Sequence, residues 1–229
     1  MTPTTQLLDP ALTVAEIVLR NPETARIFQD ARIDFCCRGG VSISEACKSA
    51  KVAEDALVAK LEGEIRARVG EVVEDDPRSL STAELVSLLV SRHHAYLRKT
   101  LPFMEALAVK VSRVHGDHNP KLRDLEAAFL ELSSKLVPHL DDEEQVLFPM
   151  LMARATDRAE ARGHLASMHA EHLAVGDLLA KIRTASEDFS LPEWACNSYR
   201  ALFAELGNLE YDTLRHVHLE NHVLMPRFA

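Results

Sequence analysis

Two glutamates occupy the apolar stripes of long helical segments, each four residues after a histidine, and no other feature constrains the fold as strongly. His139 precedes Glu143 within a repeat of apolar residues, and His216 precedes Glu220 in the same way. Residues four apart lie on one face of a helix, so each pair faces a core. A buried carboxylate is costly unless it is paired or bound to a metal, and no Lys or Arg lies on either stripe near the glutamates. The pattern therefore predicts helices packed around a metal site.

Helical periodicity extends over four long segments, and the alternation typical of strands is absent. A capping box, Ser81-Thr-Ala-Glu84, marks the start of the first helix, and Pro226 ends the last. We expect an all-α fold whose C-terminal part is an up-down-up-down four-helix bundle. The expected helices cover about 81–113, 121–153, 164–184 and 193–224.

Histidine and cysteine divide the chain unequally. None of the eleven His precedes His93, whereas three of the four Cys lie before it. Short helical patterns at 13–20, 23–31 and 52–68 predict a small N-terminal helical domain over residues 1–70. An acidic, proline-containing stretch at 71–80 predicts a linker, which leaves residues 81–229 for the bundle.

Charge and composition exclude several classes of function. The formal net charge is -9 and no basic patch is present, which disfavours binding to nucleic acid or to an anionic membrane. No apolar stretch is long enough for a membrane span, and the first residues do not resemble a signal peptide. The sparse cysteines form no CxxC pair, which disfavours structural zinc. We therefore expect a cytoplasmic protein with mostly reduced thiols.

The other two bundle helices each place a histidine on their apolar stripe, His94 and His172. His94 lies about 19 residues before its helix ends and His139 about 19 after its helix begins, so antiparallel packing sets them at one height. The same count sets His139 and His172 at one height, within the error of the helix boundaries. His216 fits less well: either the fourth helix overhangs the bundle or its early part is not helical. His93 and His169 remain alternatives, because periodicity does not separate them from their neighbours.

Four imidazoles and two carboxylates, without a thiolate, suit iron, manganese or zinc. Six ligands exceed what one tetrahedral zinc ion uses, whereas two ions bridged by the two glutamates would use all six. We assign His115 and His118 to a loop, and His218 and His222 to the outer faces of their helix.

Three segments resemble one known family. They are HLDDEEQVLFP at 139–149, HVHLENHVLMPR at 216–227 and DFCCRGG at 34–40. They are similar to the motifs of the Repair of Iron Centres family, the iron–sulfur cluster repair di-iron proteins with a hemerythrin-like bundle and a small N-terminal domain. Met225, where the family usually has Phe, and Pro138 within a helix are modest departures.

The resemblance implies a carboxylate-bridged centre of two iron ions, with Glu143 and Glu220 as bridges. It favours His94 over His93 and His172 over His169, and it sets Glu171 beside the metal. The terminal ligands that it implies are His94, His139, His172 and His216.

The same resemblance implies a stress-response protein that repairs iron–sulfur clusters damaged by nitric oxide or oxidants, through iron delivery, nitric-oxide reduction or both. Its partners would be damaged iron–sulfur proteins, with nitric oxide or oxygen as small ligands. We interpret Cys36 and Cys37 as a candidate redox dithiol, with two structural thiols as the alternative. Two other functions stay open: a non-catalytic carrier or sensor of oxygen or nitric oxide, and a structural or zinc protein. The sequence leaves enzymatic activity and a homodimer open.

Overall fold

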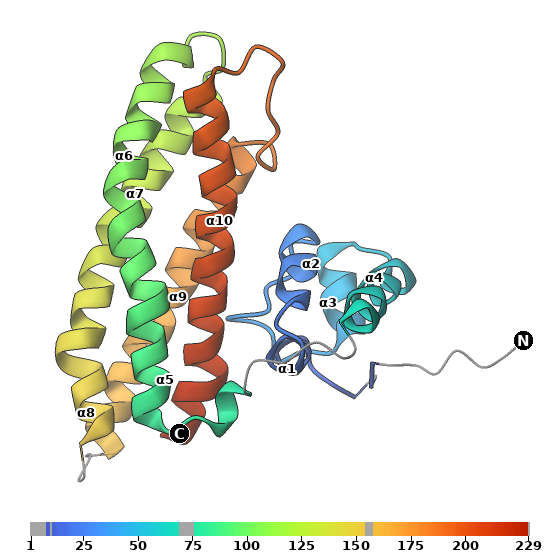
Figure 1. Ribbon diagram of the computed structural model, residues 1–229, viewed down its shortest axis with the longest axis vertical. Coiled ribbons are helices and arrows are strands. Elements are labelled where there is room, and N and C mark those ends of the chain that lie inside the picture. The colour runs from blue at the N-terminus through green and yellow to red at the C-terminus, as the bar shows by residue number, and fades with distance from the viewer. Residues whose placement is uncertain (1–7, 10, 69–75, 154–157, 229) are drawn as a thin grey trace, which may run out of the picture. The chain divides into compact units, whose positions relative to one another are not determined.

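The computed structural model describes residues 8–9, 11–68, 76–153 and 158–228 (Figure 1). The described residues form helices joined by loops, and none of them forms a strand, which confirms the all-α prediction. The chain divides into two compact units, one of Met1–Ser81 with Val217–Arg227 and one of Thr82–His216 with Phe228–Ala229. The expected linker at 71–80 lies partly outside the described residues.

Four short helices build the N-terminal part of the first unit. Capping boxes fix the starts of two of them, because Thr13 and Ser42 each accept the backbone N–H of a glutamate three residues later. The apolar faces of these helices meet in a small core that includes Ile17, Phe28 and Leu61. The helices are α1 (Val14–Arg20), α2 (Thr24–Asp30), α3 (Ile43–Ala50) and α4 (Glu54–Ala67).

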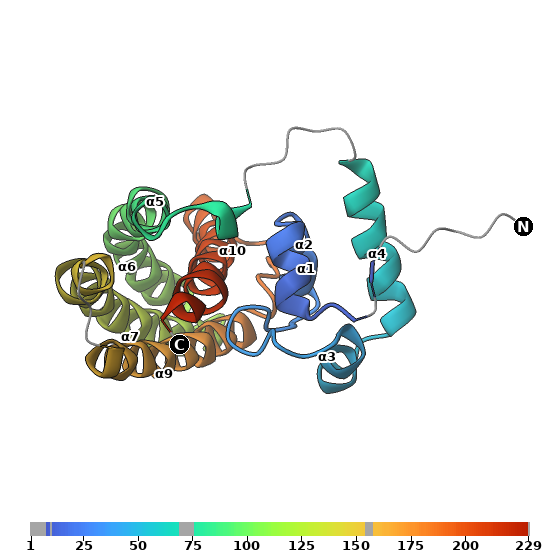
Figure 2. The ribbon, with the colours of Figure 1, turned by 90° about the horizontal axis from the view of Figure 1, so that it is seen from below.

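Four long helices run side by side around one core, as Figure 2 shows in a view close to their axes. Three of them consist of consecutive segments without a break, and in each a π-helical segment follows an α-helix. In order they are α5 (Thr82–Leu88), η2 (Leu89–His94) and α6 (Ala95–His115); α7 (Lys121–Asp142), η3 (Glu143–Leu147) and α8 (Phe148–Met152); α9 (Arg158–Ala185); and α10 (Asn197–Leu219) with η4 (Glu220–Leu224).

The core of the bundle is built from the apolar stripes that the sequence predicts. Leu97, Leu132, Leu179 and Leu209, one from each helix, are almost completely buried there. None of the described helices has both the length and the apolar character that crossing a membrane requires.

Two helix starts differ from the sequence prediction. Residues 158–163, which lie between the expected second and third helices, already belong to α9, because their Ala, Glu and Arg favour helix and Gly163 has open space around it. Residues 193–196, which we expected in the fourth helix, form a turn after Pro192, and α10 begins only at Asn197. The early part of the expected fourth helix is thus not helical, which removes part of the mismatch at His216.

Candidate metal centre

Three π-helical segments mark the place where the candidate ligands gather. His94 is the last residue of η2, Glu143 is the first of η3, and Glu220 is the first of η4. A π turn inserts one extra residue into a helix and redirects the side chains that follow, and such turns occur often at functional sites. Each of these three helices therefore departs from regular α geometry next to a candidate ligand.

All six expected ligands are buried, with exposed fractions between 0% and 5%. Their side-chain donor atoms form two groups, and within each group these atoms lie within 4.8 Å of one another. Both groups contain Glu143 and Glu220. One is completed by His94 and His216, and the other by His139 and His172.

The two oxygens of Glu143 face different histidines. Its Oε2 lies 3.4 Å from Nε2 of His94, and its Oε1 lies 3.3 Å from Nε2 of His139. On the first side, Nε2 of His216 lies 3.1 Å from Nε2 of His94. On the second, the rings of His139 and His172 are 5.1 Å apart. One carboxylate therefore stands between two clusters of imidazole nitrogens, which is the placement that a bridging ligand needs.

Carboxylates hold two of these histidines from the outside. Nδ1 of His94 donates to Glu144 over 2.9 Å, and Nδ1 of His139 donates to Glu171 over 2.7 Å. With the proton on Nδ1, the lone pair of Nε2 points into the cluster, and such outer hydrogen bonds are common for metal-binding histidines. The family resemblance implied Glu171 beside the site, whereas nothing in the sequence pointed to Glu144, which directly follows Glu143.

Arg98 fixes Glu144 in turn. Its guanidinium donates to Glu144 over 3.0 Å and to Asp141 over 2.7 Å. Burial raises the pKa of Glu144, but hydrogen bonds from His94 and Arg98 outweigh this effect and lower the pKa below its ordinary value. Glu144 is therefore ionised at neutral pH and able to hold the His94 ring.

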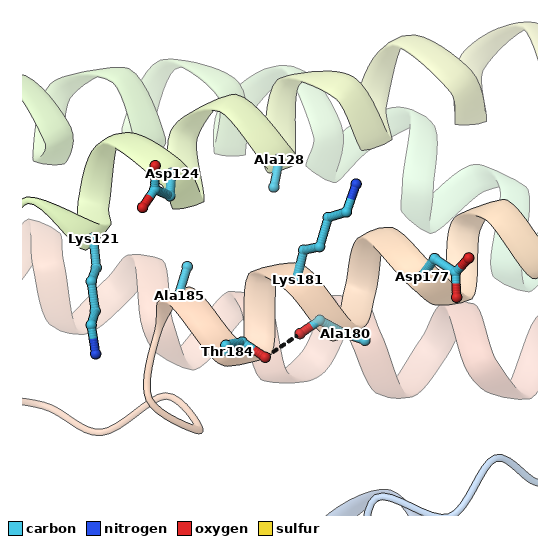
Figure 3. A pocket seen from close by; sticks show the side chains of 8 residues that line it. All are labelled: Lys121, Asp124, Ala128, Asp177, Ala180, Lys181, Thr184 and Ala185. Atoms are coloured by element: carbon cyan, nitrogen blue, oxygen red, sulfur yellow. Dashed lines mark hydrogen bonds between the residues drawn. The ribbon is translucent and has the colours of Figure 1, made fainter.

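Glu171 opens onto the surface instead. Its side chain is 51% exposed, and a hollow of about 530 Å³ beside it is lined also by Lys135, His139 and Asp142. A second hollow, of about 510 Å³, lies between α7 and α9 further along the bundle (Figure 3). The described residues that line it are alanines, a threonine and charged residues such as Lys181 and Asp177, and none of them is His or Cys. The second hollow therefore offers neither imidazole nor thiolate ligands to a metal.

The remaining histidines near the site have other roles. His93 is buried, donates to Asp212 over 2.9 Å and stacks on the His216 ring at 5.6 Å. Among the described residues, both ligand groups leave out His93 and His169. The assignment of His218 to an outer, exposed face is wrong: this residue is only 2% exposed, and its Nδ1 donates to the carbonyl oxygen of Phe35 over 3.0 Å. The periodicity of a single helix does not reveal what covers its outer side.

Cys36 and Cys37 lie in the loop between α2 and α3, with 3.6 Å between their Sγ atoms. The four cysteines, all within the described residues, form no disulfide. The hydrogen bond with Cys37, burial and the nearby Asp34 carboxylate together raise the pKa of Cys36 well above its ordinary value. Cys47 is buried, and Cys196 lies exposed with its Sγ 3.1 Å from Nε2 of His115.

Comparison with known proteins identifies the architecture. The family described as "Hemerythrin HHE cation binding domain" matches residues 87–228. Residues 11–64 match a "Domain of Unknown function (DUF542)". An "Iron-sulfur cluster repair protein YtfE" of Yersinia pseudotuberculosis serotype O:1b (strain IP 31758) is 34% identical over 206 residues, which is 90% of this chain and 91% of the relative. The chain belongs to this family of iron–sulfur cluster repair proteins.

A further relative in this family, the protein of the same name from Yersinia pestis (strain Pestoides F), is 33% identical over the same shares of both chains. The matched hemerythrin family is described as cation-binding and covers the bundle residues, in agreement with the buried His and Glu clusters. The chain is therefore a metal-binding, hemerythrin-like helical protein, and the expected resemblance is confirmed.

Proposed function

We propose that the six buried residues bind two iron ions in the bundle domain that we assign to residues 81–229. Glu143 and Glu220 would bridge the ions. His94 and His216 would hold one ion, and His139 and His172 the other. The observation that carries this assignment is the division of the Glu143 carboxylate between His94 and His139. Nitrogen and carboxylate ligands suit iron, and two bound cations offset the buried negative charge.

The protein supplies a dry, fixed site for these ions. The six ligand side chains are buried from solvent, while Glu144 and Glu171 orient two imidazoles and hold their Nδ1 protons. A ferrous pair, when bound, supplies electrons for reduction of small molecules or labile iron for delivery. The hollow beside Glu171 and His139 gives solutes a route to the edge of the site.

From this site and its relatives' name we propose that the protein repairs iron–sulfur clusters damaged by nitrosative or oxidative stress, by iron delivery, nitric-oxide reduction or both. Its clients would be damaged iron–sulfur proteins in the cytoplasm. We further propose that Cys36 and Cys37 act as a dithiol that contacts the client or supplies electrons. Because the pKa of Cys36 is raised, the more exposed Cys37 would be the reactive thiol.

The test uses the iron-loaded full chain and a [4Fe–4S] dehydratase whose cluster has been damaged by nitric oxide. Recovery of dehydratase activity, with loss of iron from the protein, supports delivery. Formation of nitrous oxide, which consumes two nitric oxide molecules, two electrons and two protons, supports reduction. Glu143→Gln should abolish both, whereas Glu131→Gln, an exposed change on the same helix, should leave them intact. Reversible oxygen binding without either activity would favour a carrier instead.

A further inference from the structure

The loop that carries the adjacent cysteines is held in one conformation from within. Oδ1 of Asp34 accepts the backbone N–H of Cys36 over 3.0 Å and that of Cys37 over 2.8 Å. The loop closes at Gly39, where an added Cβ would lie 2.3 Å from the carbonyl oxygen of Phe35. The carbonyl of Gly39 then accepts the N–H of Ala15 in α1 over 2.8 Å. The loop is therefore a tight, anchored turn rather than a free surface segment.

Two side chains from the Val217–Arg227 segment of the same unit hold the loop from outside. His218 donates to the carbonyl of Phe35, and Asn221 donates to the carbonyl of Cys36, each over 3.0 Å. The Asn221 amide nitrogen also lies 3.7 Å from Sγ of Cys37. Because several backbone groups of the loop are hydrogen-bonded, the backbone that carries the two cysteines is held in place.

The separation of these sulfur atoms matches that of two ligands of one metal ion. A disulfide would need about 2.05 Å between them. Two thiolates on one tetrahedral ion, each at about 2.3 Å from the metal, stand about 3.8 Å apart. The observed distance is 3.6 Å, and Oδ1 of Asp34 lies 3.2 Å from Sγ of Cys36. The donor atoms of Asp34, Cys36 and Cys37 all lie within 4.8 Å of one another.

Three potential anions this close repel one another unless protons or a cation lie between them. This is the physical reason why the pKa of Cys36 is raised: the Cys37 thiol, burial and the Asp34 carboxylate all disfavour a second negative charge. A divalent cation reverses this balance, because it binds the thiolates and lets each coordinating thiol release its proton to solvent.

We propose that Asp34, Cys36 and Cys37 form a second metal site, which binds one thiophilic cation of the zinc and cadmium class per chain. Thiolate ligands select such soft or borderline ions, whereas the histidine and carboxylate cluster of the bundle contains no sulfur. The site offers three protein ligands, so one coordination position stays open for water or for a group of a client protein. Its existence does not depend on the iron assignment in the bundle.

Cadmium is the probe, because thiolate-to-cadmium charge transfer in the ultraviolet reports only on sulfur ligands. The reduced, iron-loaded full chain is titrated with Cd²⁺ while this band and the iron content are followed. We expect the band to saturate at one Cd²⁺ per chain. Cys37→Ser should weaken this binding at least tenfold. Asp34→Asn should weaken it too, because it removes the charge but keeps an oxygen that can accept the two N–H groups.

Cys47→Ser is the matched control, since Cys47 is a buried thiol of the same unit, and it should leave the titration unchanged. Bound Cd²⁺ should also protect Cys37 from alkylation by iodoacetamide, a readout that needs no variant. A full charge-transfer band in Cys37→Ser, or rapid alkylation of Cys37 in the presence of saturating Cd²⁺, would overturn the proposal. Failure of iron binding in the bundle would leave this titration unaffected, so the two assignments are tested separately.

Discussion

Replacing Glu143 by Gln should change the stability of the metal-free and metal-loaded protein in opposite directions. The Glu143 carboxylate is 1% exposed, and its oxygens lie 3.4 Å and 3.3 Å from the Nε2 atoms of His94 and His139. Both Nε2 atoms are acceptors when the Nδ1 protons are held by Glu144 and Glu171. A Gln amide would remove the buried charge and donate to one of these acceptors. The free energy of unfolding of the metal-free protein should then rise by about 1–3 kcal/mol.

For a bundle of this size that gain corresponds to a rise in melting temperature of about 3–9 °C. With iron we expect the opposite sign, because the variant would lack one of the proposed bridging carboxylates and should retain less than one iron per chain. The assay is thermal unfolding by circular dichroism, with and without chelator, combined with iron analysis. Glu131→Gln on the same helix serves as control and should alter neither quantity. If the metal-free Glu143→Gln protein melts below the metal-free parent, the carboxylate is a structural hydrogen-bond partner and the reasoning from buried charge is wrong.

Three further predictions concern the scaffold. Gly39→Ala should destabilise the first unit by about 2 kcal/mol or more in urea unfolding, because the added Cβ would force the backbone at Phe35 to shift. Gly40→Ala, which has open space around it, is the control and should be nearly neutral. Arg183→Met should lower the free energy of unfolding by about 3–5 kcal/mol, because it removes the guanidinium that pairs with the buried Glu210 carboxylate. In a double-mutant cycle, the double mutant Arg183→Met/Glu210→Gln should recover part of that loss. Thr13→Ala should cost about 1 kcal/mol at neutral pH by breaking the α1 capping box. The backbone N–H and the hydroxyl of Thr13 both hydrogen-bond to the Glu16 carboxylate and lower its pKa. Only the hydroxyl bond is lost in the variant, so that part of the cost should fade as the pH falls below the ordinary pKa of Glu16, near 4.5; an equal loss at pH 3 and pH 7 would contradict it.

Spacing within one helix predicts the bundle and the two His–Glu pairs, whereas the choice of His94 over His93 and of His172 over His169 depends on the family resemblance. An apolar stripe with His and Glu four apart needs only helical periodicity to place the pair on the buried face. The heights of His94 and His139 followed from counting residues along antiparallel helices. Helix starts were less predictable, since the start of α9 at Arg158 depends on weak propensities and that of α10 at Asn197 on a turn after Pro192.

The outer hydrogen bonds escaped sequence reasoning for a different reason. Glu144 and Arg98 are partly exposed charged residues, and in the sequence they are indistinguishable from an ordinary solvated helix face. Their pairing depends on how α6 and η3 meet, which one helix does not encode. The π turns at His94, Glu143 and Glu220 were equally invisible, because their residues have no distinctive composition.

A buried charge is therefore the feature of a metal centre that is easiest to recognise in a sequence. Glu143 and Glu220 are buried carboxylates within apolar stripes, and bound cations would offset the cost of burying their charge. The residues that orient the ligands give no such signal, because a partly exposed carboxylate such as Glu171 is common on a protein surface. The donor atoms of a metal site are thus identified by the cost of burying them. The groups that hold those donors in place are identified only by the distances that tertiary packing sets.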